Sequence, residues 1–425
     1  MCKSKKVAKD VIEPKPQQSS SSSEPIMFMP RKSSSQKSRK SQSSSSSNSI
    51  YSSIPTTGSS YFNKESWKTT SSSSFGKDPL SGLRDSLPEQ PHIYDFSEII
   101  SATNNFSLKP FSSSSTSTSW RCVMRVGDVI LIQRKFRRPI NSSELVDRLA
   151  LICKSHHSSL VKLKGASISG NYIYLVYDYI QGASLADCLR NSKNPHFTVL
   201  SNWMSRVKIA ADIAHGLDYV HNSTGLGFNF VHNHIKSTSI IITSTLNAKI
   251  CHFGTAELCG EIVDLPPAKS LQRKGSARLK FEGTRGYMAP EFQQTGMATQ
   301  KTDVYAFGVV MLELFSGEEP LKYLVDEETG GYVRLSVIET AREAAVEGGG
   351  GVRRWVDKRM KDSYPVEVAE KLVRLGLECV GNEPDKRPDM GRIVAWISQL
   401  YLESETWVEK MGGIPSDFSV SLAPR

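Results

Sequence analysis

Three histidines in two short segments are the residues best suited to chemistry. His232 and His234 stand in "FVHNHIKSTSIII", residues 230–242, and His252 stands in "AKICHFG", residues 248–254. An imidazole accepts a proton near neutral pH and binds transition metals through its ring nitrogens. His234 is therefore a candidate general base, and the three rings together are a candidate Zn²⁺ site. The alternative is that each ring fills a polar position and binds nothing.

The segments before these histidines have the pattern of strands. "WRCVMRVGDVILIQRKF", residues 120–136, is rich in β-branched residues and predicts two strands joined at Val126-Gly127-Asp128. "SLVKLKGASISGNYIYLVYDYI", residues 159–180, predicts a second strand pair that turns at Gly170-Asn171. Between the two pairs, residues 144–155 have the spacing of a helix. These elements predict a small β-rich lobe.

Helices dominate the chain after Gly182. Residues 202–222 carry an apolar stripe typical of a long helix, and further helical patterns continue to about Trp407. A short amphipathic helix at 93–106 precedes the strands. A β-rich lobe followed by a helical lobe predicts a bilobal α+β domain. The expected boundaries are residues 91–412 for the domain, about 106–180 for its small lobe and about 181–412 for its large lobe, with a tail at 413–425.

The first 90 residues differ in composition from the rest. Serine dominates from Pro14 to about Phe75, so this region buries too little apolar surface to fold and is expected to be disordered. Residues 1–90 contain 14 Lys and Arg and 7 Asp and Glu, and so hold +7 of the net charge of +10. This basic region is a candidate contact for acidic membrane surfaces or nucleic acid. Cys2 beside its lysine cluster is a candidate for palmitoylation.

The composition favours a cytoplasmic protein. The chain has 425 residues, 38% of them hydrophobic, which is enough for a large core. We find no apolar run long enough to span a membrane and no secretory signal. The seven cysteines lack metal-binding spacing, so we expect free thiols in a reducing compartment. The expected location is cytoplasmic, with peripheral contact at the plasma membrane through the basic tail.

Three motifs late in the chain identify a resemblance. They are "GTRGYMAPEF" at 283–292, "TDVYAFGVVMLELFSGEEP" at 302–320 and "NEPDKRPDM" at 382–390. In this order the chain resembles a eukaryotic protein kinase of the plant receptor-like group, over about residues 93–411. "ETAREAAVEGGGGVRRWVDKRM" onward is similar to LysM receptor-like kinases. The resemblance implies the bilobal kinase fold and ATP as cofactor.

The resemblance also assigns scaffold roles. It implies that Glu291 and Arg387 form a buried ion pair, and that Asp303 accepts backbone hydrogen bonds from the loop around His232. Gly254 belongs to the same structural set. Because losing one partner of a buried pair costs about 3–5 kcal/mol, these residues predict a folded large lobe.

Several positions that hold nucleotide in the family are altered. The glycines of the phosphate-covering loop are replaced by Ser112, Ser114 and Ser117, and the phosphate-pairing lysine by Gln133. Lys135, two residues on, is a possible substitute. Arg148 stands where the lysine's glutamate partner is expected. The remaining expected nucleotide contacts are Tyr177 and Asp178.

The catalytic positions are altered as well. His234 replaces the acid that orients the substrate hydroxyl, although the neighbouring Lys236 is retained. Ser239 and His252 replace the two metal ligands, and Mg²⁺ prefers oxygen ligands of higher charge. We therefore predict a pseudokinase in which ATP binding is doubtful and Mg²⁺ is not expected.

Two other functions are compatible with these residues. A divergent active serine/threonine kinase would use Lys135 or Lys236 for phosphates and His234 as base. A third possibility is nucleic-acid or membrane binding through the basic tail. As a pseudokinase, the chain would bind other kinases or receptor complexes. In the basic segment at 268–287, the candidate phosphorylation sites are Ser270, Ser276 and Thr284.

Overall fold

A computed structural model describes most of the chain after residue 90. The described residues are 91–138, 142–194, 198–223, 225, 229–262, 283–325 and 330–412. They belong to one compact unit within residues 77–425. The expectations for the tail at 1–90, for Cys2 and for the tail at 413–425 lie outside the described residues.

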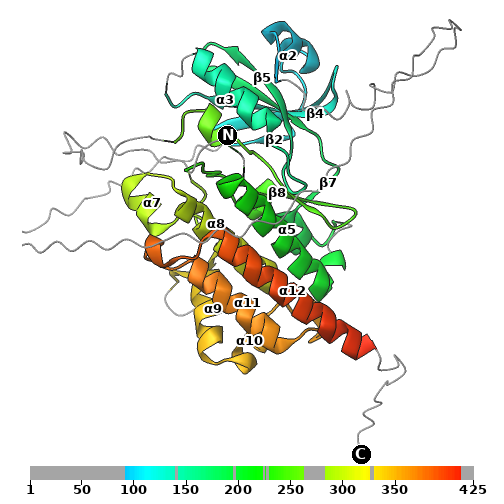
Figure 1. Ribbon diagram of the computed structural model, residues 1–425, viewed down its shortest axis with the longest axis vertical. Coiled ribbons are helices and arrows are strands. Elements are labelled where there is room, and N and C mark those ends of the chain that lie inside the picture. The colour runs from blue at the N-terminus through cyan, green and yellow to red at the C-terminus, as the bar shows by residue number, and fades with distance from the viewer. Residues whose placement is uncertain are drawn as a thin grey trace, which may run out of the picture. The chain divides into compact units, whose positions relative to one another are not determined.

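The small lobe is a six-stranded sheet with two helices (Figure 1). The strand order is β1-β5-β6-β4-β3-β2, and β1 pairs in parallel with β5 while the other pairs are antiparallel. Both predicted strand pairs and both predicted helices are present. The elements are β1 His92–Ile93, α2 Phe96–Ala102, β2 Ser112–Ser113, β3 Ser117–Met124, β4 Gly127–Lys135, α3 Ser142–Lys154, β5 Leu163–Ser169 and β6 Tyr172–Asp178.

Alternation along β4 decides which residues face the rest of the molecule. Val129 and Leu131 point into a cluster with Trp120 beneath α2. Ile132 points the other way, into the main core that contains Leu149 of α3. Because successive side chains of a strand face opposite sides, the residues after Ile132 continue this alternation toward the large lobe.

The large lobe is built around α8, Gln300–Ser316, in which every residue from Thr302 to Ser316 is buried. An apolar helix of this kind can be stable only inside a core, and the main hydrophobic cluster surrounds it. The other helices are α4 Leu185–Arg190, α5 Trp203–Asn222, α6 Thr255–Leu258, α7 Pro290–Thr295, α9 Val337–Val346, α10 Gly349–Trp355, α11 Val366–Cys379 and α12 Met390–Gly412. Among the described residues, no helix is long and apolar enough to cross a membrane.

A small sheet carries the segments that contain the histidines. It consists of β7 Gly182–Ser184, β8 Ile240–Thr243 and β9 Ala248–Ile250, in the order β7-β8-β9. His232 and His234 lie in the loop between α5 and β8, and His252 follows β9 directly. The sheet therefore brings the two histidine segments, which are separate in the sequence, to one place.

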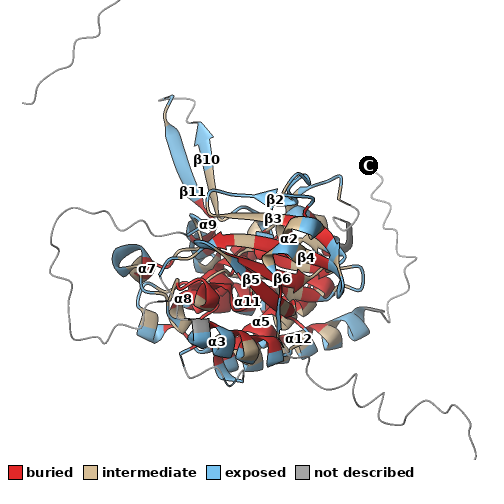
Figure 2. Ribbon diagram, turned by 90° about the horizontal axis from the view of Figure 1, so that it is seen from above, coloured by how far each residue is buried: buried red, intermediate tan, exposed pale blue. Residues whose placement is uncertain are grey.

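The large lobe, which we had expected to be mostly helical, also contains a β-hairpin that was not predicted. β10, Leu321–Val325, and β11, Tyr332–Ser336, form an antiparallel pair that projects from the body of the domain (Figure 2). Apart from this hairpin and the small sheet of β7, β8 and β9, the bilobal α+β architecture is as predicted, with a β-sheet lobe followed by a helical lobe.

Candidate functional site

Asp303 in the first turn of α8 fixes the loop that carries His232 and His234. Its carboxylate accepts hydrogen bonds from the backbone N–H groups of His232 at 2.7 Å and Asn233 at 2.8 Å. The Nε2 atom of His221, at the end of α5, lies 3.0 Å from the same carboxylate. Asp303 is buried. The expected backbone contacts of Asp303 are therefore present.

His234 faces a carboxylate that sequence reasoning had missed. Its Nε2 atom lies 3.0 Å from Oε2 of Glu261, in the segment after β9. The two groups are in contact, although the geometry is not that of a well-aligned hydrogen bond. The side chains are 17% and 10% exposed, so solvent shields the contact only weakly. The imidazole at the proposed base position is thus already engaged within the chain.

Glu261 is the centre of a small charge cluster. Its Oε1 atom accepts a hydrogen bond of 2.7 Å from Arg134, and both of these side chains are about nine-tenths buried. Burial alone would raise the pKa of Glu261, but the charges of His234 and Arg134 outweigh it and lower the pKa to about 2. Glu261 is consequently an anion at neutral pH, held between a histidine and an arginine.

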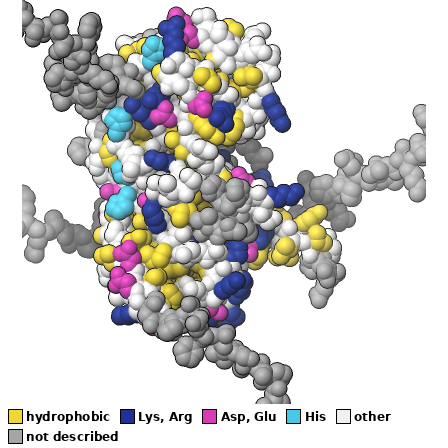
Figure 3. All heavy atoms as spheres, turned by 90° about the vertical axis from the view of Figure 1, so that its right-hand side faces the viewer, with side chains coloured by type: hydrophobic (Ala, Val, Ile, Leu, Met, Phe, Trp, Pro, Cys, Tyr) yellow, Lys and Arg dark blue, Asp and Glu magenta, His cyan; other side chains and the backbone are white. Residues whose placement is uncertain are grey.

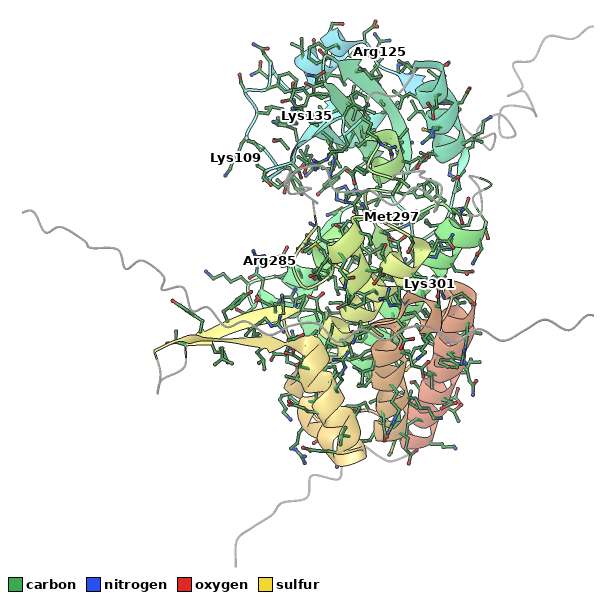
Figure 4. The ribbon with its side chains drawn as sticks, turned by 90° about the vertical axis from the view of Figure 1, so that its left-hand side faces the viewer. Lys109, Arg125, Lys135, Arg285, Met297 and Lys301 are labelled. Carbon is green, nitrogen blue, oxygen red and sulfur yellow. The ribbon has the colours of Figure 1, made fainter. Side chains whose placement is uncertain are left out.

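The basic residue of β4 that faces this site is Arg134 and not Gln133. The Gln133 amide donates to the Tyr174 hydroxyl at 3.0 Å, on the other face of the strand. Lys135 is exposed at the strand end (Figure 4). The count from Gly127 therefore ended one residue too early. Because neighbouring side chains of a strand face opposite sides, this error of one position selected a residue on the wrong face. The position facing the cavity therefore retains a positive charge.

Arg148 of α3 is also paired, but not with β4. Its guanidinium donates to the carboxylate of Glu257 in α6 and, at 2.6 Å, to Glu144 in its own helix. Among the described residues, Arg148 thus binds glutamates and not a basic residue of β4. Instead, Arg134 and Arg148 each bind a glutamate of the segment after β9. This segment, residues 251–262, is thereby attached to the small lobe.

The metal-ligand positions hold neutral side chains that face the same region. The Ser239 hydroxyl is buried and has no hydrogen-bond partner in the described part of the chain, and the same is true of Nδ1 of His252. Burial, followed by the nearby charges of His234 and Arg134, holds the pKa of His252 well below its usual range. The ring centroids of His234 and His252 are 6.1 Å apart. No group of three His, Cys, Asp or Glu within the described ranges could hold a metal ion.

A serine-rich turn covers the site from the small lobe. β2 and β3 flank this turn, and the Ser114 N–H donates to the Ser117 carbonyl at 2.8 Å. The hydroxyl of Ser114 also accepts from the Ser117 N–H at 3.2 Å. Ser114 and Ser117 line the cavity below, whereas Ser112 is paired in β2 and does not. The serines thus bond within the turn where glycines were expected.

Tyr177 and Asp178, the expected nucleotide contacts at the end of β6, do not line this cavity. The Tyr177 hydroxyl donates to the carbonyl of Phe253 at 2.7 Å and lies 2.9 Å from the Thr255 hydroxyl. Asp178 is in ion-pair contact with Lys164 at 3.3 Å. Tyr177 therefore attaches residues 251–262 to the sheet, next to the contacts of Arg134 and Arg148.

The cavity enclosed by these elements has a volume of about 390 Å³. Lys236 lines it, and its ammonium donates to the Thr284 hydroxyl at 3.3 Å. Burial and the charge of Arg134 lower the pKa of Lys236. The other charged and catalytic-position side chains that line the cavity are Arg134, His234, Ser239, His252 and Asp303. The chain thus gathers a polar cavity with two cationic groups at the expected catalytic position.

Two further contacts hold the large-lobe side of the site. Arg387 makes a bidentate ion pair with Glu291, at 2.6 and 2.8 Å, as the resemblance implied. Gly254 has φ +80°, and a Cβ atom there would lie 2.6 Å from Ile152.

Sequence reasoning missed Glu313, a buried residue of α8 that accepts from Arg190 at 2.9 Å and Ser237 at 3.0 Å. Thr284 is exposed, while Ser270 and Ser276 lie outside the described residues.

Comparison with known families and structures agrees with this geometry. Residues 129–397 match the family model described as protein tyrosine and serine/threonine kinase. The pseudokinase domain of BIR2, described as an immune regulator of the RLK/Pelle family, aligns with a TM-score of 0.56 and 22% identity. That alignment covers 79% of this chain and 97% of the BIR2 domain. The BIR2 likeness shows the fold.

Several curated plant proteins are similar in sequence. LysM domain receptor-like kinase 3 of Arabidopsis thaliana is 30% identical over 78% of this chain and 50% of its own length. Protein LYK5 of the same plant is 31% identical, over 84% and 49%. Chitin elicitor receptor kinase 1, also from Arabidopsis, is 34% identical, over 66% and 42%. The chain spans about half the length of these relatives.

Proposed function

Because the chain belongs to the protein tyrosine and serine/threonine kinase family, we propose that it is a pseudokinase, which signals by binding other proteins. Phosphotransfer requires metal ions on the phosphates and an acid that orients the attacking hydroxyl. In this chain His234, His252 and Ser239 stand at those positions. None of the three supplies the anionic oxygen that Mg²⁺ prefers.

The contact between His234 and Glu261 carries the proposal. A general base must have a free lone pair directed at the hydroxyl that it deprotonates. Here Nε2 of His234 is 3.0 Å from a carboxylate of the same chain, so that nitrogen is not directed at a substrate hydroxyl and only Nδ1 is left to act as a base. Arg134, which faces the cavity, is bonded to the same carboxylate. The groups that would position substrate and phosphate are therefore bound to each other.

A divergent active serine/threonine kinase is the second candidate. Lys236 and Arg134 line the same cavity as His234, so cationic groups are available for phosphates. Glu261 could hold the ring through Nε2 while Nδ1 of His234 acts as the base. Use of Nε2 as the base would instead require residues 251–262 to move away from the small lobe, which would break the contacts of Tyr177, Arg134 and Arg148.

Thermal stability of the full chain with ATP tests the proposal. We expect no rise in melting temperature that depends on Mg²⁺ or Mn²⁺, and no transfer of labelled phosphate to the chain or to a generic substrate. A rise without metal would agree with nucleotide as a structural ligand. A metal-dependent rise together with phosphotransfer that His234→Ala abolishes would establish the active kinase instead.

The proposed partners are active receptor-like kinases or their complexes, by analogy with the relatives. The basic residues 1–90 are a proposed peripheral membrane contact. Co-sedimentation of the full chain with vesicles containing phosphatidylserine tests this second point, because binding that survives deletion of residues 1–90 would contradict it.

A further inference from the structure

The hairpin of β10 and β11 exposes an unusual amount of apolar surface. Five of its large side chains are each more than half exposed: Tyr323, Leu324, Val325, Tyr332 and Val333. In Figure 3 the hairpin extends from the right-hand edge as a largely hydrophobic projection. Exposed patches of this kind mark interaction surfaces.

Both faces of the hairpin carry an apolar pair. Val325 pairs directly with Tyr332 on one face, and Leu324 pairs with Val333 on the other. Residues directly opposite each other in an antiparallel pair share a face. The sheet has only these two strands among the residues that the structure describes, so each outer edge is open to another strand. An extended peptide could therefore pair with an edge and cover a face at once.

A basic cavity of about 460 Å³ lies at the base of the hairpin. Arg285, Arg334 and Arg342 line it together with Glu339, which accepts from Arg334 at 3.1 Å. These are the charged residues of the lining, so its net charge is +2. Figure 4 shows Arg285 beside the hairpin.

Tyr323 connects the two features. It lines the cavity and is also one of the exposed residues of the hairpin. Gly286 lies where the segment after residue 283 meets the hairpin base, and a Cβ atom there would be 2.7 Å from Pro320. The basic cavity and the apolar hairpin therefore form one continuous surface, and the chain at Gly286 packs closely against Pro320 at its base.

We infer that this surface binds an extended segment of a partner protein that carries a phosphorylated serine or threonine beside apolar side chains. The inference rests on the proposed role as a binding protein and names the kind of segment bound. A phosphate carries a charge of about −2 at neutral pH, which matches the net charge of the cavity. A single carboxylate would leave one guanidinium without a counter-charge.

The geometry of arginine favours the same ligand. A guanidinium donates two parallel hydrogen bonds to phosphate oxygens. Arg285 and Arg342 have no carboxylate contact among the described residues, and Arg334 has one. The phosphate would therefore bind between Arg285 and Arg342, and the apolar flanks of the peptide would lie along Tyr323, Val325 and Tyr332.

An oriented peptide library tests the inference with the full chain. The library has a fixed phosphoserine among random neighbours, and a matched library has serine in its place. We expect the immobilised protein to retain the phosphorylated library at least about tenfold over the serine library, which is the effect of charge-assisted hydrogen bonds. The retained peptides should be enriched in apolar residues at alternate positions.

Single substitutions locate the binding. Arg342→Gln should lower retention by about tenfold, while Arg125→Gln, which changes an exposed arginine of the small lobe, should leave it unchanged (Figure 4). Tyr332→Ser should remove the apolar enrichment without removing the preference for phosphate. An unchanged melting temperature of each variant shows that it remains folded.

Three results would overturn the inference. The first is equal retention of both libraries. The second is equal loss in Arg125→Gln and Arg342→Gln. The third is a dimer in sedimentation that Tyr332→Ser dissociates, without phosphopeptide preference, because the hairpin would then bind a second copy. The nucleotide and phosphotransfer measurements on the same preparation report separately on the proposed pseudokinase function.

Discussion

The side chains of His234 and Glu261 contact each other in the centre of the catalytic region. The 3.0 Å contact of their side chains joins the loop before β8 to the segment after β9. Arg134 adds a third group from the small-lobe sheet. One carboxylate thus connects three parts of the chain: the small-lobe sheet, the loop before β8 and the segment after β9.

Glu261→Gln should destabilise the domain. It removes the buried ion pair of Glu261 with Arg134, and the expected loss in free energy of unfolding is about 3 kcal/mol. Urea denaturation measures this loss. Glu347→Gln is the matched control, because the pair of Glu347 with Arg354 is more than half exposed on both sides and should contribute less than about 1 kcal/mol. Similar losses in both variants would show that Glu261 is not the centre of a buried cluster.

Stability should fall as pH decreases from about 6.5 to about 4. Burial lowers the pKa of His232 from 6.5 to about 4, which outweighs the opposing charge of Asp303. The unfolded chain binds the proton first, so the contribution is complete above pH 6.5 and is lost toward pH 4. The loss is about 3 kcal/mol.

Urea denaturation across this pH range measures the effect of His232. The slope of the free energy of unfolding against pH should become smaller in His232→Gln. It should stay unchanged in His92→Gln, which changes an exposed histidine. Identical slopes in the wild type and His232→Gln would contradict the assignment.

Gly254→Ala should be far more damaging than Gly170→Ala. Both glycines have positive φ, +80° and +58°, so both substitutions carry backbone strain of about 1 kcal/mol. Only at Gly254 does the new Cβ meet another atom, Cγ2 of Ile152 at 2.6 Å. We expect an additional loss of about 1–3 kcal/mol there. Equal melting temperatures for the two variants would mean that α3 moves away at no cost.

Tyr177→Phe should loosen residues 251–262. The change removes the hydrogen bond to the Phe253 carbonyl and leaves that group buried, at a cost of about 1–3 kcal/mol. Hydrogen exchange should accelerate in this segment by more than tenfold. Tyr172→Phe, on an exposed residue of the same strand, should change neither quantity. Unchanged protection in Tyr177→Phe would show that the ion pairs alone hold the segment.

The double substitution His252→Asp and Ser239→Asn should create a metal site. Both positions line the cavity, and a carboxylate with an amide oxygen suits Mg²⁺. We expect an ATP-dependent rise in melting temperature that requires Mg²⁺ in the double variant and none in the wild type. The pair His252→Asn and Ser239→Ala is the control without a charged ligand. If the double substitution gave no rise, the cavity would be inaccessible to the metal nucleotide.

The sequence was sufficient where contacts depend on short motifs. Asp303, Glu291 and Arg387 bind the groups that the motifs implied. Strand pairs were predicted because a period of two residues is visible locally. The site around Glu261 was not predictable in this way, because Arg134 lies 127 residues earlier in the chain. No local pattern reports such a contact.

Two errors have simple physical causes. The turn between β3 and β4 comprises Arg125 and Val126, and Gly127 is already paired with Met124. Counting from this turn therefore assigned the cavity-facing position to Gln133 and not to Arg134. The hairpin at 321–336 was missed even though "LKYLV" and "YVRLS" have β-branched and aromatic residues, because the motifs on either side implied a helical lobe.

Asp303 binds the loop through peptide N–H groups, and every amino acid except proline has one. These two hydrogen bonds therefore do not depend on which side chains stand at 232 and 233. Substitution of the other side chains of the loop can leave these two hydrogen bonds, and with them the attachment of the loop to α8, in place. The attachment of a catalytic loop can in this way be kept when its reactive residues are not.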